Sequence, residues 1–253
     1  MKTLLRTLLI GGAGFCAIAG GAQAAASAQA PVNVAQQLAA VQAKLMDWAQ
    51  LGRYAAENAA LAPAAAGERR VVFYGDSITD AWGRQPGTGT FFPGKPYVNR
   101  GISGQTTAQM VVRFHQDVVD LHPAAVVILA GTNDVAQNTG PMTDEMTLDD
   151  FRAMTEMARA NGIKVVVASI LPAGDFWWHK GLEPAPKIRA LNARLEAWCR
   201  SEGMVWVDYY SPMADANGAM KPGLSADGVH PNAAGYAIMA PLAEAGIRKA
   251  LGK

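Results

Sequence analysis

From Arg70 onward the chain alternates between short apolar runs and segments of helical periodicity, and this alternation restricts the possible folds more than any other feature. The runs are rich in β-branched residues, have the length of strands, and span residues 70–74, 97–102, 124–130, 163–171 and 204–208. Parallel strands need crossover connections, and right-handed crossovers place helices on the sheet. The sequence therefore predicts an α/β protein, a three-layer α/β/α sandwich around a five-stranded parallel sheet with flavodoxin-like strand order.

Local signals mark the ends of the helices between these strands. Thr147 is expected to cap one helix, which Gly162 ends. Pro186 is expected to open the next helix, which closes before Gly203. Two further helices are predicted over residues 106–121 and 232–251, and a Gly/Pro-rich loop over residues 83–96.

The first thirty residues have the three-part pattern of a secretory signal peptide. Lys2 and Arg6 flank the start of an apolar stretch, and runs of small residues follow it. A membrane anchor is the alternative, but glycines interrupt the stretch and no stop-transfer flank follows. We expect residues 1–24 to be removed on export, with cleavage as late as residue 30. The mature protein would then be periplasmic or secreted, without a stable membrane span.

Residues 33–69 are expected to form an N-terminal helix and a linker, ahead of one domain over residues 70–253. Apolar residues recur at spacings of three and four and predict a helix over about residues 33–55, with a packed stripe of Leu38, Val41, Leu45 and Trp48. The alanine-rich stretch that follows contains Pro63 and Gly67 and is most simply a connector.

Charge and cysteine content exclude several classes of partner. The chain has 22 basic and 21 acidic residues, and residues 1–24 carry two of the basic ones and no acid. Nothing in that balance suggests a basic patch, so no nucleic acid is expected as a partner. Cys199 is the only cysteine left after residue 24, in an apolar helical pattern typical of a packed thiol. No two histidines or cysteines have metal-ligand spacing, so no metal is expected. No other cofactor is expected either, and the sequence does not indicate an oligomeric state.

Four polar segments should meet at the carboxyl edge of the predicted sheet. Three of them close strands, at residues 75–77, 101–104 and 131–134, and the fourth, residues 225–231, precedes the last helix. In an open α/β sheet this edge is where ligands bind. Ser77 in Gly75-Asp76-Ser77 would stand there near a helix N-terminus, although for an isolated motif of this kind a capping role is the simpler interpretation.

Together the segments supply the parts of a serine esterase. Ester hydrolysis by a hydroxyl group needs a base, a group that orients the base, and donors for the oxyanion. Ser77 offers the hydroxyl, His230 is the candidate base, and Asp227 can orient the imidazole. The oxyanion candidates are the backbone N–H groups of Ser77 and Gly104 and the side-chain amide of Asn133.

Each of these residues also has a purely structural interpretation. Asn133 and Gly104 could serve turns, as most loop asparagines and glycines do. His179 competes with His230, because Asp175 precedes it by four residues. Trp177 and Trp178 in the same stretch could form a substrate-binding wall or lid, or could simply be packed aromatics in a surface loop.

The four segments resemble the ordered blocks of the GDSL or SGNH hydrolase superfamily, whose name lists residues that match Ser77, Gly104, Asn133 and His230. The similarity runs from about residue 70 to residue 250, and Ile78 stands where the family usually has Leu. The resemblance implies a metal-independent serine esterase with a flavodoxin-like fold and an acyl-enzyme intermediate.

Residues 98–101 and 131–134 look closest to the branch of platelet-activating-factor acetylhydrolase subunits and secreted bacterial acetylesterases. That branch implies short acyl or acetyl groups on a small-molecule, carbohydrate or lipid ester. The alternatives are a lysophospholipase, a thioesterase, an acyltransferase, and a non-catalytic carbohydrate-binding envelope protein.

Overall fold

The computed structural model describes residues 33–252, so the expected signal peptide lies outside the described residues. Of the described residues, 33–41 belong to a separate unit, and those from Gln42 onward form one compact unit. Within the described range, no helix is long and apolar enough to cross a membrane.

Five parallel strands form the sheet of the compact unit, in the order β2-β1-β3-β4-β5. This confirms both the predicted strand number and the flavodoxin-like order. Gly75, the last residue of β1, pairs with the last residues of β2 and β3, so these three strands end at one level. The strands are β1 (Val71–Gly75), β2 (Tyr97–Gly101), β3 (Ala125–Leu129), β4 (Lys164–Ala168) and β5 (Val205–Val207).

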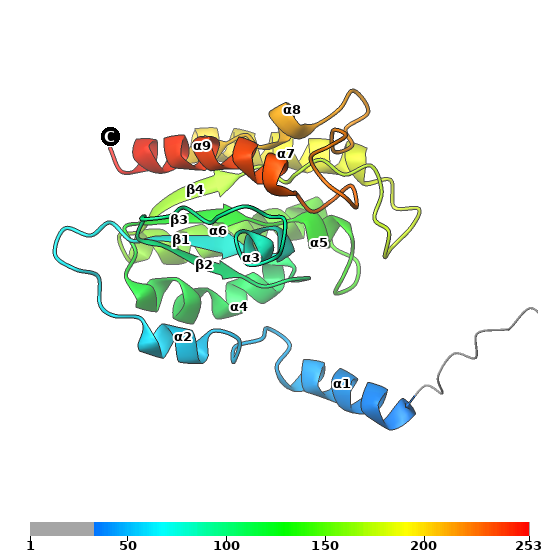
Figure 1. The fold of residues 1–253 in the computed structure, drawn as a ribbon, viewed down its shortest axis with the longest axis horizontal. Helices are drawn as coiled ribbons and strands as arrows, with labels where there is room; N and C mark the ends of the chain where they lie inside the picture. The colour runs from blue at the N-terminus through cyan, green and yellow to red at the C-terminus, as the bar shows by residue number, and fades with distance from the viewer. Residues whose placement is uncertain (1–32, 253) are drawn as a thin grey trace, which may run out of the picture. The chain divides into compact units, whose positions relative to one another are not determined.

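Side chains alternate between the two faces of the sheet and build two apolar cores. On β1, Val72 and Tyr74 pack into one core and Val71 and Phe73 into the other. The first core includes residues of α4 (Thr107–Asp117), α6 (Asp144–Ala160) and α7 (Pro184–Ser201). The second includes residues of α3 (Ser77–Ala81), α8 (Tyr210–Met213) and α9 (Ala233–Ala250). Figure 1 shows the sheet between α4 on one side and α9 on the other, the predicted three-layer arrangement.

Two predicted helix starts are wrong, by four and by two residues. Helix α6 begins at Asp144, because the Thr143 side chain accepts the backbone N–H of Met146, and Thr147 is buried inside the helix. Helix α7 begins at Pro184 rather than Pro186. A proline fits the first turn of a helix because its missing N–H has no partner there, and this applies to either proline.

The N-terminal helix is shorter than predicted. Helix α1 covers Val34–Met46, after which the Asp47 carboxylate accepts the backbone N–H groups of Leu51 and Gly52 and shapes a turn. Leu45 and Trp48 are exposed, so the predicted packed stripe is wrong there. The remaining short elements are α2 (Ala55–Ala60), the 3-10 helix η1 (Val119–Leu121) and α5 (Thr132–Val135).

Candidate active site

Ser77 is the first residue of α3 and stands directly after strand β1. Asp76 caps this helix, with its carboxylate 3.0 Å from the backbone nitrogen of Ile78. The turn is tight because Gly75 has no side chain; a Cβ atom there would collide with the Thr79 hydroxyl and the Leu129 carbonyl oxygen. Ser77 is thereby half-buried at the carboxyl edge of the sheet, where its sequence position predicts it.

His230 and Asp227 lie beside this serine. The Ser77 Oγ atom is 2.8 Å from Nε2 of His230, and Nδ1 of His230 is 2.7 Å from Oδ2 of Asp227. A carboxylate can only accept, so Nδ1 carries the proton and Nε2 presents its lone pair to the Ser77 hydroxyl. The three side chains form a continuous chain from carboxylate to imidazole to hydroxyl.

The loop of residues 225–231 fixes Asp227 in this orientation. Its second carboxylate oxygen accepts the backbone N–H groups of Val229 and His230, at 2.9 and 2.8 Å, and the Ser225 hydroxyl at 3.0 Å. Partial burial alone would raise the pKa of Asp227, but hydrogen bonds from His230 and from these backbone groups outweigh it and hold the pKa well below its usual range. The carboxylate therefore stays ionised beside the imidazole.

Gly104 and Asn133, the other two oxyanion candidates, lie in the segments that follow β2 and β3. Gly104 is exposed and has a φ of +81°, a conformation that glycine adopts without strain. The Asn133 side chain is buried, with Nδ2 2.9 Å from the Gln105 carbonyl oxygen and 3.4 Å from Oδ2 of Asp76. Its Oδ1 atom accepts from Asn138 at 2.7 Å. The orientation of the Asn133 amide is thus set on both sides.

The Nδ1 atom of His230 pairs with Asp227, not with Asp76. The Asp76 carboxylate instead accepts the backbone N–H of Ile78 and stabilises the turn before α3. It is fully buried, and this burial raises its pKa to about 7, against the opposing effects of the Ile78 N–H and nearby His230. A carboxyl in this environment differs from the ionised, partly exposed Asp227, which agrees with the prediction that Asp76 shapes the turn.

The aromatic stretch after β4 lies at the edge of the site. The Trp178 ring centre is 6.4 Å from that of His230, and its indole Nε1 donates to Oδ1 of Asn138 at 2.9 Å. Trp177 is 61% exposed and packs edge-on against Trp178. His179 donates through Nδ1 to the Ala136 carbonyl at 2.8 Å, while Asp175 pairs with Lys180, so the competing histidine–acid pair does not form.

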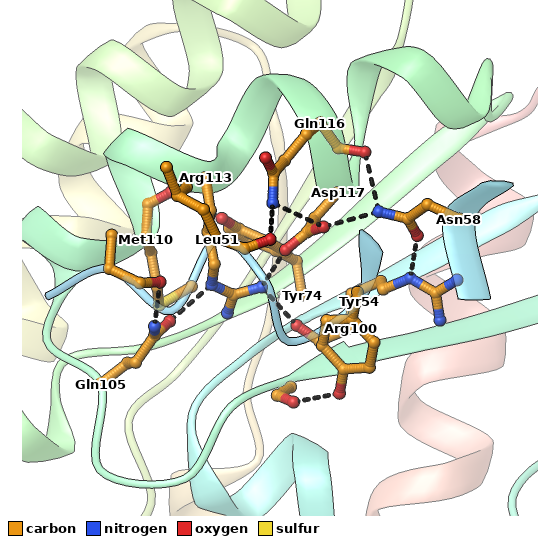
Figure 2. A network of polar contacts seen from close by, with 12 residues as sticks. Leu51, Tyr54, Asn58, Tyr74, Arg100, Gln105, Met110, Arg113, Gln116 and Asp117 are labelled. Atoms are coloured by element: carbon orange, nitrogen blue, oxygen red, sulfur yellow. Dashed lines mark hydrogen bonds and ion pairs between the residues drawn. The ribbon is translucent and has the colours of Figure 1, made fainter. Parts of the chain in front are cut away.

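Sequence reasoning missed a buried polar network behind the oxyanion candidates (Figure 2). Arg113 on α4 is fully buried and donates to Gln105, to Asp117 and to two strand-end carbonyls. A signal was present, because Arg113 and Asp117 stand four residues apart on the same face of α4 as Met110 and Phe114. Charged residues on a buried helix face indicate a paired, hydrogen-bonded role.

In the part of the chain that the structure describes, no group of three histidine, cysteine or acidic side chains could hold a metal ion. Cys199 is buried, and burial raises the pKa of its thiol to about 12.

Comparison with known proteins gives concordant matches. The model of the GDSL-like lipase/acylhydrolase family matches residues 73–238. A GDSL-like lipase of known structure from Bacteroides thetaiotaomicron VPI-5482 is 47% identical, with a TM-score of 0.76 over 80% of this chain and 99% of that one. An acetylxylan esterase from Geobacillus stearothermophilus is 29% identical over 199 residues, which are 68% of this chain and 90% of that protein. The solved structure of Axe2, an acetylxylan esterase of the same organism, is 19% identical with a TM-score of 0.56 over 73% of this chain and 94% of that one, and it shows similarity of fold alone.

Proposed function

The chain belongs to the GDSL-like lipase/acylhydrolase family and is a carboxylic ester hydrolase, and from this premise we propose that it removes short acyl groups, acetyl foremost, through an acyl-enzyme on Ser77. The observation that carries the proposal is the chain of two short contacts, 2.8 Å from Ser77 to His230 and 2.7 Å from His230 to Asp227. This is the arrangement that nucleophilic catalysis by a serine requires.

In the proposed mechanism, Ser77 Oγ attacks the ester carbonyl carbon while Nε2 of His230 takes its proton. Asp227 keeps the imidazole in the required tautomer and stabilises it when it is charged. The tetrahedral oxyanion collapses, His230 returns the proton to the leaving alcohol, and the acyl group remains on Ser77. A water molecule then attacks the acyl carbon while His230 takes its proton, the bond from that carbon to Ser77 Oγ breaks, and His230 returns the proton to Oγ as the carboxylic acid leaves.

The oxyanion would be held by the backbone N–H groups of Ser77 and Gly104 and by the Asn133 amide. The long 3.4 Å contact between Asn133 and Asp76 is the one that an oxyanion would replace, because the shorter contact to the Gln105 carbonyl orients the amide. Loss of one such donor typically costs about 3 kcal/mol of transition-state stabilisation.

Preference for acetyl esters is supported by the similarity to an acetylxylan esterase over most of that protein's length. Trp178, close to His230, offers a flat apolar surface for the substrate. Such a surface suits a sugar ring or an acyl chain. Activity on acetyl esters should therefore be compared with lysophospholipase and thioesterase activity. Residues 1–24 are proposed as an export signal, which would place the enzyme in the periplasm or outside the cell.

Activity of the chain without residues 1–24 should be measured on p-nitrophenyl esters of increasing acyl length, on acetylated xylo-oligosaccharides, on a lysophospholipid and on an acyl thioester. The proposal expects the highest kcat/KM on acetyl esters and no turnover by Ser77→Ala above the blank. Ser211→Ala, which removes an exposed hydroxyl in α8, should keep full activity.

Labelling by a fluorophosphonate probe should reach Ser77 in the wild type and no serine in the Ser77→Ala protein. Wild-type turnover by Ser77→Ala would refute the mechanism. Absence of both turnover and labelling in the wild type would instead favour a non-catalytic carbohydrate-binding protein.

A further inference from the structure

Gln105 is connected to two of the three oxyanion candidates, Gly104 and Asn133. It follows Gly104 directly, and its backbone carbonyl accepts the Asn133 side-chain amide at 2.9 Å. Its own side chain is 1% exposed and does not reach the site. Contacts that hold the Gln105 side chain therefore also hold the peptide bond between Gly104 and Gln105 and orient the Asn133 amide.

Two buried contacts hold this side chain. The Gln105 amide donates from Nε2 to the Ala49 carbonyl at 2.8 Å and accepts at Oε1 from Nε of Arg113 at 2.5 Å. Arg113 also donates to the carbonyls of Gly75 and Arg100, at 3.0 and 2.9 Å, which are at the ends of β1 and β2. Figure 2 shows Gln105 and Arg113 side by side within this network. The Arg113 guanidinium thus links β1, β2 and the Gln105 side chain.

The far end of the network is the anchor segment, residues 48–58, which precedes the residues matched by the family model. Its Trp48 and Leu51 carbonyls accept the side-chain amides of Gln109 and Gln116, at 2.6 and 2.7 Å. Tyr54 is fully buried and donates its hydroxyl to the Gly101 carbonyl. The segment is tied to α4 and to the end of β2 at several points and gives the Gln105 side chain a fixed partner.

We propose that Gln105 is a positioning residue for ester hydrolysis, and that the anchor segment takes part in catalysis by holding Gln105 and, through it, the Asn133 amide. The inference rests on the proposed function, because it needs Asn133 as an oxyanion donor. Such donors stabilise a transition state only when they are aimed in advance at the developing charge. A Gln105 carbonyl that can rotate would let the Asn133 amide turn away.

The simpler interpretation is that Gln105 only stabilises the fold, and a double-mutant cycle separates the two. Gln105→Met removes both side-chain contacts at similar volume and should be made in the wild type and in Asn133→Ala. Gln116→Met is the matched control, because it removes a tie to the same segment through Leu51, and the Gln116 side chain contacts Leu51 and Asp117 rather than Gln105 or Asn133. The steady-state kcat and KM on p-nitrophenyl acetate and the melting temperature should be measured for each.

We expect Gln105→Met to lower kcat roughly 10- to 100-fold with KM changed less than about twofold, because a small misplacement of a catalytic group is costly. Gln116→Met should keep kcat within about twofold. In the Asn133→Ala background the effect of Gln105→Met on kcat should shrink to less than about threefold, because the amide that it positions is gone.

An equal loss of kcat in both backgrounds, an unchanged kcat, or a raised KM with kcat retained would overturn the proposal. If Gln105→Met does not fold, Gln105→Glu replaces it in the same cycle, since it keeps an acceptor for Arg113 and puts an acceptor oxygen in place of the donor to Ala49. A wild type without turnover dependent on Ser77 would refute the proposed function instead.

Discussion

The buried ion pair of Arg113 and Asp117 on α4 allows a quantitative test of how the site is held. Both side chains are 0% exposed, and their closest nitrogen and oxygen atoms are 3.1 Å apart. Arg113→Met removes the cation and leaves the Asp117 carboxylate with hydrogen bonds from Asn58 and Gln116 only, at 2.7 and 3.5 Å. Breaking a buried pair from one side typically costs about 3 to 5 kcal/mol, because an uncompensated charge stays buried.

The free energy of unfolding should therefore fall by about 3 to 5 kcal/mol in Arg113→Met, measured by urea denaturation at neutral pH. Replacing both partners, with Arg113→Met and Asp117→Leu together, removes the stranded charge. The double variant should be more stable than Arg113→Met alone, although the Gly75 and Arg100 carbonyls still lose the hydrogen bonds from Arg113.

A surface pair gives the control for this prediction. Arg159 and Glu202 are each 44% exposed and 2.7 Å apart, so Arg159→Met should cost less than about 1 kcal/mol. A loss below about 1 kcal/mol in Arg113→Met, or a double variant less stable than Arg113→Met, would contradict the argument from burial.

Three further predictions concern single side chains. Asp227→Asn should lower kcat roughly 10³- to 10⁴-fold on p-nitrophenyl acetate, because a neutral amide no longer selects the required His230 tautomer; retained activity would exclude Asp227 as the orienting acid. Folding raises the pKa of Asp76 to about 7, so the folded state keeps a proton that the unfolded state releases near pH 4. This carboxyl should therefore lower the free energy of unfolding as the pH rises from about 4 to about 7. Asp76→Asn should remove that dependence, at most about 1.4 kcal/mol per pH unit in urea titrations across this range, and an identical pH dependence in both proteins would contradict it. The buried Cys199 thiol should resist alkylation in the folded protein and react in urea, as mass spectrometry would show, whereas rapid modification before unfolding would exclude a packed thiol.

The sheet could be predicted because each strand is a short apolar run and three of them end in a polar block. Gly75-Asp76-Ser77 and the segment of residues 131–134 mark strand ends directly, and parallel pairing brings them to one edge. Ser77, His230 and Asp227 lie where that reasoning expects them, with Ser77 and Asp227 each within hydrogen-bonding distance of His230.

Some local features could not be predicted because a tertiary contact decides between equivalent residues. Thr143 and Thr147 are both able to cap α6, and Thr147 instead lies buried near Asp134, which accepts from Thr107. Gln105 gives no signal at all in the sequence, since its partners are an arginine eight residues later and a carbonyl 56 residues earlier. Only the folded chain shows which carbonyls the strands and loops leave unpaired.

Three contacts of the anchor segment are made by its backbone carbonyls: those of Trp48 and Leu51 accept from side chains of α4, and that of Ala49 accepts from Gln105. Every amino acid supplies such an acceptor, so substitutions here can accumulate without loss of the contacts. The residues matched by the family model begin at residue 73, within β1, whereas the compact unit begins at Gln42. Fragments of this enzyme for expression or engineering should therefore begin upstream of Trp48, so that they keep these hydrogen bonds.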